Sequence, residues 1–150
     1  MSHDVLTRSA FTPVEPMSVA DAGLTDSEVE AIILKYLAAR GDATGNAITT
    51  QVCLPYPLVN EALARLRDAR MVVYKCSSGM NDFVYQVTEL GREEARRLAA
   101  RCTYFGAAPV PLEDYIDSVL AQGTSERYPS PGDLAAAFQG LMLSSAITDR

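Results

Sequence analysis

The sequence of 150 residues contains one histidine, three cysteines and no long apolar run. The histidine, His3, stands near the amino terminus, and its isolation argues against histidine-based catalytic triads, zinc proteases and mixed Cys/His zinc fingers. No run of 18 apolar residues is present, so we expect no transmembrane helix. The first residues lack the basic and apolar regions of a secretory signal. These absences predict a cytoplasmic protein with no metal, cofactor or membrane partner.

The three cysteines, Cys53, Cys76 and Cys102, are scattered and form no CxxC pair. An odd, dispersed set of this kind is typical of reduced cytosolic thiols rather than of disulfides or a metal site. We therefore expect these side chains to be mostly buried.

The composition is that of a globular protein, with 48% hydrophobic and 21% charged residues, which excludes disorder of the whole chain. The net charge of −6 divides into −4 for residues 1–45, +2 for residues 46–101 and −4 for residues 102–150. Nucleic-acid binding depends on clustered cations. Only the middle segment offers a cationic surplus, and that surplus is small.

A first helix is predicted after Leu24, with Thr25 as its N-cap and Glu28 completing a capping box. Leu24 and Val29 are placed to form a hydrophobic staple across this start, and Gly41 is expected to end the helix. Its apolar residues recur at helical spacing and form one stripe: Val29, Ile32, Ile33, Tyr36 and Leu37.

Two further helices are predicted around a proline-bearing turn. The first spans about 46–53, and Pro55 then biases the chain away from helix. Pro57 suits the first turn of a new helix, predicted over 57–70. The apolar stripe that should bury this helix consists of Val59, Ala62, Leu63 and Leu66.

The period then changes from helical to alternating. Residues 71–77 and 83–89 alternate around the turn-forming stretch SGMND, which predicts a β-hairpin. Thr88 is placed to cap a last helix that runs to about residue 102. Met71, Tyr74 and Tyr85 are expected to be strand core residues or cross-strand pairs.

Beyond this helix the sequence YFGAAPVPLEDY indicates a linker or a strap, and Pro111 opens a short helix. Asp133 is expected to cap a final helix. The predicted organisation is a flexible arm over 1–23, a domain over 24–102, and a strap with a helical extension over 103–150.

The order helix, helix, turn, helix, hairpin, helix resembles the winged helix-turn-helix of bacterial transcription regulators over residues 25–102. The stretch VYQVTELGREEARRLA is similar to the second wing strand and the following helix of that family. The resemblance implies a mainly α fold with a small β-hairpin (α+β), extended by C-terminal helices.

A second resemblance covers nearly all of residues 24–150. The stretches YFGAAPVPLEDY and PGDLAAAFQGLMLSSAITDR are similar to the region before the ATPase core in a group of bacterial AAA+ proteins. This implies a fragment of a larger ATPase or a stand-alone relative. The chain has no GxxxxGK[ST] motif, so we do not expect it to bind or hydrolyse ATP as a P-loop enzyme.

The predicted recognition helix starts with apolar rather than basic residues. Asn60 is placed to read adenine, whereas Glu61 has the wrong sign for a phosphate. Lys75 is the only cation of the hairpin, and Asp82 is expected to oppose it. The arginines fall late in the helix and fit either phosphate contacts or a solvated or salt-bridged face. The candidate nucleic-acid or phosphate contacts are Asn60, Arg65, Arg67, Arg70 and Lys75.

Four apolar or aromatic residues are candidates for contact with a partner: Tyr56, Met80, Tyr104 and Phe105. Met80 lies at the expected wing tip, where an exposed apolar side chain suggests a contact surface. Tyr104 and Phe105 lie on the strap, which either packs on the winged helix or docks a neighbouring domain.

Together these patterns favour a non-catalytic binding or regulatory module, with the N-terminal protein-interaction domain of an AAA+ ATPase as the first hypothesis. Its expected partner is a protein or the downstream ATPase domain, and homo-oligomerisation stays open. The alternative is a DNA-binding winged-helix transcription regulator. A third, weaker hypothesis is a nucleotide-sensing winged helix in which Arg65 and Arg67 bind phosphates.

Overall fold

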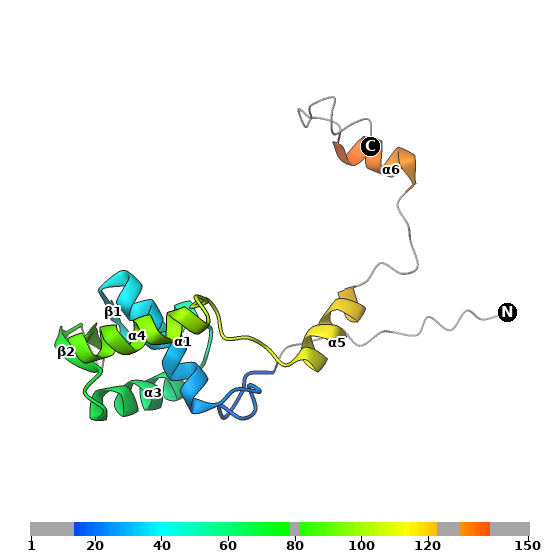
Figure 1. Ribbon diagram of the computed structural model, residues 1–150. Helices are drawn as coiled ribbons and strands as arrows, with labels where there is room; N and C mark the ends of the chain where they lie inside the picture. The colour runs from blue at the N-terminus through cyan, green and yellow to red at the C-terminus, as the bar shows by residue number, and fades with distance from the viewer. Residues whose placement is uncertain (1–13, 79–81, 123–129, 139–150) are drawn as a thin grey trace.

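The computed structural model describes residues 14–78, 82–122 and 130–138 (Figure 1). Over these residues it contains six helices and one three-stranded sheet. In chain order the elements are α1 (Asp26–Arg40), β1 (Asp42–Thr44), α2 (Gly45–Val52), α3 (Tyr56–Asp68), β2 (Val72–Ser77), β3 (Phe83–Val87), α4 (Glu89–Arg101), α5 (Leu112–Gln122) and α6 (Pro131–Phe138).

Helix α1 begins and ends where its sequence predicts. The Thr25 hydroxyl accepts a hydrogen bond from the Glu28 backbone N–H at 3.3 Å, and the Glu28 carboxylate accepts one from the Thr25 N–H at 2.8 Å. This reciprocal pair is a capping box. Gly41 ends the helix at a φ of 99°, which a side chain would strain, and donates to the Leu37 carbonyl.

Helices α2 and α3 form the helix-turn-helix. Helix α2 is capped by the Thr44 hydroxyl and ends at Cys53, whose φ of 54° is left-handed. Helix α3 starts one residue before Pro57 and ends two residues before the predicted boundary. It ends there because Arg70 is also left-handed, with a φ of 59°, and a residue in that conformation cannot continue a right-handed helix.

The predicted hairpin is confirmed as β2 and β3, which pair antiparallel with a bulge between Tyr74 and Cys76. Strand β1, which the sequence analysis did not identify, pairs with the other edge of β3 and gives the order β1-β3-β2. Its three residues are too few for an alternating pattern to be seen. Pairing with β3 is what makes them a strand.

The two strands of the hairpin differ in burial. In β2 only Val72 is buried, and its other residues are exposed despite their alternation in hydrophobicity. Tyr74 and Tyr85 face each other across the strands, as expected for a cross-strand pair. Tyr85 lies on the central strand β3 and is buried, whereas Tyr74 lies on the edge strand β2 and is 44% exposed.

Helix α4 is capped by the Thr88 hydroxyl, as predicted. Gly91 lies where α4 crosses the start of β2, and a Cβ there would meet the Met71 carbonyl oxygen and lie 2.7 Å from Val87 Cγ2. Only glycine allows this close approach. At the other end of α4, the Lys35 ammonium of α1 donates to the Cys102 carbonyl at 2.9 Å.

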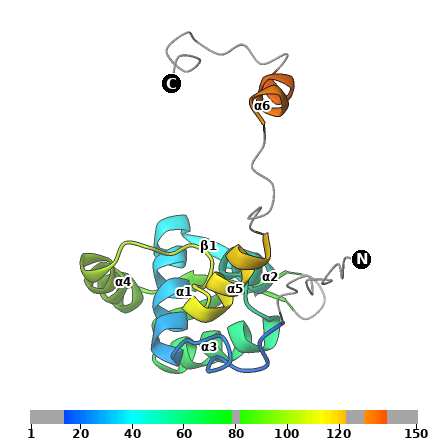
Figure 2. The same cartoon turned by 90° about the vertical axis from the view of Figure 1, so that its right-hand side faces the viewer.

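The core lies between α1, α2, α3, α4 and the sheet. The predicted stripe of α3 is buried in full, and Leu63 is 1% exposed. Helix α1 packs against α3 and α4, which Figure 2 shows on either side of it. The helix order and the antiparallel sheet beside a helix-turn-helix identify a winged helix with C-terminal helices, in the α+β class.

The expectation of buried cysteines is wrong, since all three are exposed and free. Cys53 and Cys102 stand at the C-terminal ends of α2 and α4, and Cys76 lies on the exposed strand β2. Segment ends and an uncovered strand face do not supply the neighbours needed to bury a side chain.

Outside the winged helix, the described chain continues at both ends. Ala22, before α1, packs into the core, and the neighbouring Gly23 lies against Pro111 of the strap. Helices α5 and α6 extend away from the α1–α4 body (Figure 1). The N-cap of α6 is Ser130 rather than Asp133, because Asp133 is the third helical residue and reaches back to the Ser130 N–H at 2.9 Å.

Candidate functional site

Helix α3 stands on the surface as a recognition helix does, but its outward face is not basic. Its exposed side chains are Pro57, Asn60, Glu61 and Asp68. Asn60 is therefore available for a base or any other polar group. The two carboxylates of this face would repel phosphates at the positions where a DNA reader places its cations.

Arg65 is directed toward α1 and not toward the outward face of α3. Its Nε donates to Glu30 Oε1 at 2.5 Å, and its Nη2 lies 2.9 Å from Asp26 Oδ1. The hydrogen bond to Glu30 is the largest cause that raises the pKa of Arg65. The guanidinium is thus already neutralised by two carboxylates, and its side chain is only 37% exposed.

Arg67 lies over the wing. Its Cζ is 4.6 Å from the centroid of the Tyr74 ring, and its Nη1 donates to the Tyr74 hydroxyl. The Tyr74 ring in turn lies 4.5 Å from that of Phe83 and 5.2 Å from that of Tyr85. Burial, followed by the proximity of Tyr74, raises the pKa of Tyr85 above its usual range. This stack fixes the wing against α3 by a cation–π contact.

Lys75 pairs with Asp42 of β1, not with Asp82 as expected from the sequence. The Lys75 Nζ lies 2.5 Å from Asp42 Oδ2, and this hydrogen bond is the largest cause that lowers the pKa of Asp42 and raises that of Lys75. Arg70 is exposed, and no ion pair involves it in the described part of the chain. It is the candidate cation most available to an external anion.

Asp82 has a different role, which the sequence analysis missed. It is 5% exposed, and its carboxylate accepts hydrogen bonds from the backbone N–H groups of Gly45, Asn46 and Phe83 at 2.8–3.2 Å. The wing is therefore attached to the N-terminus of α2, where the helix dipole favours an anion. The one signal in the sequence is that Gly45 and Asn46, at the start of a helix, have no acidic residue next to them in the chain that could accept from their backbone N–H groups.

Three of the four arginines of α4 are also paired locally. Arg92 and Arg96 both contact Glu89, at 3.5 and 3.3 Å, and Arg97 contacts Glu94 at 2.7 Å. These pairs are exposed and contribute little to stability. They also reduce the positive potential that the middle third of the sequence would otherwise present.

The strap and α5 carry the largest exposed apolar side chains that follow α4. Tyr104 is 52% exposed and its hydroxyl donates to the Ala107 carbonyl, while Phe105 is 38% exposed. The Ala108 N–H donates to the Val52 carbonyl at 2.7 Å, which attaches the strap to the end of α2. Helix α5 has no buried residue.

The predicted contact residues thus fall into separate places. Tyr56 begins α3 and is half-buried, Tyr104 and Phe105 lie on the strap, and Met80 falls outside the described residues. Among the residues that are described, no cluster of three or more His, Cys, Asp or Glu side chains is placed to hold a metal ion. No helix in the same part of the chain has the length and hydrophobicity to cross a membrane.

Comparison with known proteins assigns the chain to no family. No family model matches the chain, and no curated protein matches it. Among solved structures, the chain is similar to NadR in its complex with 4-hydroxyphenylacetate, with 21% identity and a TM-score of 0.45. The match covers 82% of this chain and 79% of NadR. The ligand named there belongs to NadR, and the winged-helix fold of this chain is established by its own helix order and strand pairing.

Proposed function

We propose that this chain is a non-catalytic winged-helix module that binds another protein through α5 and the strap. The sequence resemblance suggests the setting, which is the region before the ATPase core of a bacterial AAA+ protein. The observation that carries the proposal is that the apolar stripe of α5 is exposed along its whole length. Its members are Leu112, Tyr115, Ile116, Val119 and Leu120, each at least 45% exposed.

The spacing of this stripe is that of a helix that docks in a groove. Its residues recur at i, i+3, i+4, i+7 and i+8, and the carboxylates Glu113, Asp114 and Asp117 lie outside the stripe. An isolated helix of 11 residues is marginal in water. A surface that buries the stripe would therefore stabilise α5, and a protein partner supplies such a surface.

The pairing of the cations supports a protein partner over nucleic acid. Arg65 and Lys75 are neutralised by carboxylates of α1 and β1, and Arg67 is stacked on the wing. A phosphate that binds these cations would have to displace their present partners, and the free energy of the lost contacts would reduce the affinity. Phosphate contacts supply most of the affinity in nonspecific DNA binding.

The test compares two lengths of the same chain by hydrogen–deuterium exchange. The chain of 150 residues is measured beside one extended by the coding sequence that follows residue 150. We expect the amides of α5 to be protected at least about tenfold more in the longer protein, because docking lowers the open population of a helix. Ile116→Asp should abolish this extra protection, whereas Asp117→Asn, outside the apolar stripe of α5, should keep it.

Equal exchange of α5 in the two proteins would contradict docking onto the downstream domain. A coding sequence that ends at residue 150, or continues without a P-loop, would contradict the AAA+ setting. In that case a protein partner would have to be a separate chain.

The second candidate is a DNA-binding winged-helix regulator. Two observations favour it: Asn60 is exposed on the outward face of α3, and Arg70 is free of ion pairs within the described residues. Both could contact DNA without disturbing the fold. The affinity for duplex DNA distinguishes this candidate from the protein-binding module.

Fluorescence anisotropy over a salt series measures that strength. We expect a Kd for random duplex no better than about 10⁻⁵ M at physiological salt, the nonspecific range. The variants Asn60→Ala and Arg70→Glu serve as probes of the two exposed candidate contacts. Sub-micromolar binding that both variants lose, or a motif enriched from a randomised duplex pool, would favour the DNA-binding candidate.

A further inference from the structure

The strap, residues 103–111, joins α4 to α5 (Figure 1) and is attached to the body at its start, middle and end. At the start, the Cys102 carbonyl accepts a hydrogen bond at 2.9 Å from the ammonium of Lys35, a buried residue. In the middle, the Ala108 N–H donates to the Val52 carbonyl at 2.7 Å, and Ala108 packs against the core. Because α5 begins four residues after Ala108, the connection between this anchor and the helix is short.

The end of the strap is in close contact with Gly23. A Cβ on Gly23 would lie 3.0 Å from Pro111 Cγ and 3.6 Å from Pro111 Cβ, so the proline ring packs in the space that a side chain would fill. The Pro111 carbonyl also accepts from the Tyr115 N–H at 3.1 Å, which makes Pro111 part of the first turn of α5. The contact with Gly23 therefore acts on the helix itself.

The strap has few conformations open to it. Pro109 and Pro111 fix their own φ at about −65° and confine the residue before each of them to extended conformations. The Tyr104 hydroxyl donates to the Ala107 carbonyl at 2.7 Å, and Gly106 leaves room for the ring, because a Cβ there would lie 2.8 Å from Tyr104 Cζ. A segment braced in this way is a poor hinge.

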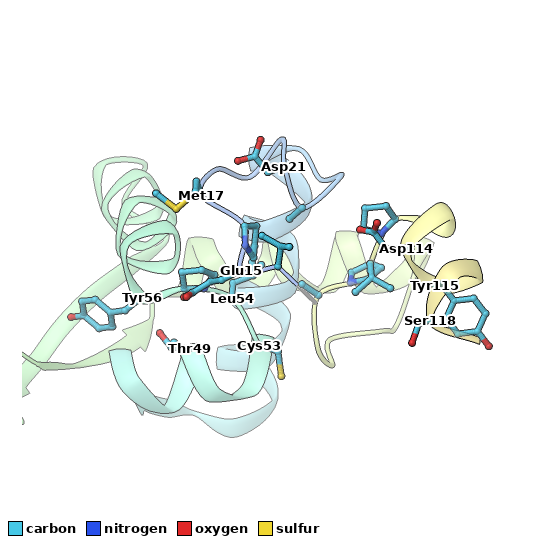
Figure 3. A pocket seen from close by; sticks show the side chains of 18 residues that line it. Glu15, Met17, Asp21, Thr49, Cys53, Leu54, Tyr56, Asp114, Tyr115 and Ser118 are labelled. Atoms are coloured by element: carbon cyan, nitrogen blue, oxygen red, sulfur yellow. The ribbon is translucent and has the colours of Figure 1, made fainter. Parts of the chain in front are cut away.

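The direction of α5 decides which of its sides is accessible. Asp114, Tyr115 and Ser118 line a cavity beside the helix-turn-helix (Figure 3), and Tyr115 is the one member of the stripe among them. The other four members of the stripe lie outside this lining, within the fully described helix α5. If α5 were turned about its axis by half a turn, the stripe would face the body and would be hidden from a partner.

We propose that the strap and the turn of residues 18–23 hold α5 in a fixed orientation, so that its apolar stripe is presented before a partner arrives. Gly23 and Pro111 are the positioning residues, since neither belongs to the stripe. The inference rests on the proposed function, because it concerns how α5 is offered to its partner. A helix that is already oriented loses less freedom on binding, so more of the contact energy appears as affinity.

Residual dipolar couplings test the orientation in the 150-residue chain, because they report the direction of each N–H bond relative to the rest of the molecule. We expect the couplings of residues 112–119 to fit the same alignment as those of α1–α4. Couplings of α5 that require a separate alignment, or amide order parameters of its first two turns below about 0.6, would overturn the proposal.

Two substitutions disturb the contact from opposite sides. Gly23→Ala should displace the proline ring, and Pro111→Ala removes that ring and its fixed φ. Each should reduce the couplings of α5 by at least about half. The double variant should recover part of the loss, because the two Cβ atoms would then lie 3.6 Å apart, an ordinary van der Waals distance. Pro131→Ala, which removes a ring from the start of α6, should leave α5 unchanged.

Thermal unfolding followed by circular dichroism verifies that the body of each variant is folded, since Gly23→Ala also places a side chain at a φ of 68°. Unchanged couplings in both single variants would show that the contact does not hold α5. A double variant that loses as much as the two single losses added together would contradict a direct contact between the two residues.

The longer protein connects the orientation to docking. Gly23→Ala and Pro111→Ala should each lower the extra exchange protection of α5 several-fold, although the stripe is intact in both. Full protection in both variants would overturn this inference and keep the proposed function. A rigidly held α5 that gains no protection in the longer protein would do the reverse, so either idea can fail alone.

Discussion

The α1–α4 body and the C-terminal strap with α5 satisfy their side chains in opposite ways. In the body, the large apolar residues of α1 and α3 are buried, and cations such as Arg65 and Lys75 have carboxylate partners. In α5, every large apolar residue is exposed, and its three carboxylates have no ion-pair partner among the described residues. The chain thus contains a domain with a buried core and a segment whose apolar side chains are exposed.

The difference indicates where an external partner can act. A partner gains little free energy by contacting the paired cations Arg65 and Lys75, because the existing ion pairs must be disturbed or desolvated first. The segment beyond the body offers apolar area and unpaired acid groups at no such cost. The following predictions compare a position in the body with a matched position in the extension.

The largest difference is expected for truncation of an apolar side chain. Leu63→Ala should lower the free energy of unfolding by about 2–5 kcal/mol, because Leu63 is 1% exposed and its loss leaves a cavity. Ile116→Ala on α5 should change it by less than about 0.5 kcal/mol. Urea denaturation of both variants measures the contrast, and a loss below about 0.5 kcal/mol for Leu63→Ala would contradict the assigned core.

A smaller difference is expected for two helical glycines. Gly91→Ala should destabilise the protein by about 1–3 kcal/mol, because the new methyl group would meet the Met71 carbonyl and Val87. Gly132→Ala in α6, where the nearest atom is Ser130 Oγ at 3.7 Å, should be neutral or raise helicity slightly. Thermal unfolding followed by circular dichroism distinguishes the two. Equal melting temperatures would show that α4 does not approach β2 so closely.

Two N-caps provide the third comparison. Thr25→Ala should cost about 1 kcal/mol of the stability of the body, because the Glu28 N–H loses its acceptor. Ser130→Ala removes the equivalent hydroxyl from α6 and should leave the unfolding of the body unchanged. Denaturation followed by tyrosine fluorescence measures this comparison, since four of the seven tyrosines, Tyr36, Tyr56, Tyr74 and Tyr85, lie in the body and none lies on α6. An equal loss in both variants would mean that α6 unfolds together with the body.

The smallest effect concerns pH. The backbone and hydroxyl of Thr25 lower the pKa of Glu28, and the ammonium of Lys75 lowers that of Asp42, from ordinary values of 4.5 and 3.8. A lowered folded-state pKa gives stability that is present above the ordinary pKa and is lost as pH falls through the folded one. The double variant Glu28→Gln, Asp42→Asn should therefore lose less stability between about pH 6 and pH 3 than the parent.

Asp133 is the matched control for the pH experiment. Its pKa is also lowered, by the Ser130 hydroxyl and backbone N–H, but it lies on α6. Asp133→Asn should leave the pH dependence of the body unchanged. If it altered that dependence as much as the double variant does, the separation between body and extension would be wrong.

Much of the body could be predicted because its signals are local. The capping box at Thr25, the prolines before α3 and the alternating hairpin each act within a few residues. The candidate site was harder to predict. For Arg65 the sequence left phosphate contact or a solvated or salt-bridged face open; the structure shows salt bridges, whose partners the sequence could not name because they are 35 and 39 residues away in the chain. Ion pairs between residues so far apart in the chain produce no periodic pattern in the sequence.

A cavity lined by residues 14–22, the end of α2, the turn into α3 and the strap shows the same limit (Figure 3). Glu15, Thr49 and Asp114 are separated by 34 and 65 residues, and no motif joins them. The sequence revealed only that both flanks are acidic. The strap, through the hydrogen bond between Ala108 and Val52 and the packing of Pro111 on Gly23, brings these segments together.

The sequence by itself determined the helix boundaries, the hairpin and the apolar stripes, because hydrogen bonding within a turn and side-chain periodicity are properties of neighbouring residues. Tertiary structure decided three things: that β1 is a strand, that Asp82 attaches the wing to α2, and that Arg65 is neutralised by carboxylates of α1. Each depends on a partner brought close only when the core forms. Side-chain chemistry is set by such partners, and they are defined in space rather than along the chain.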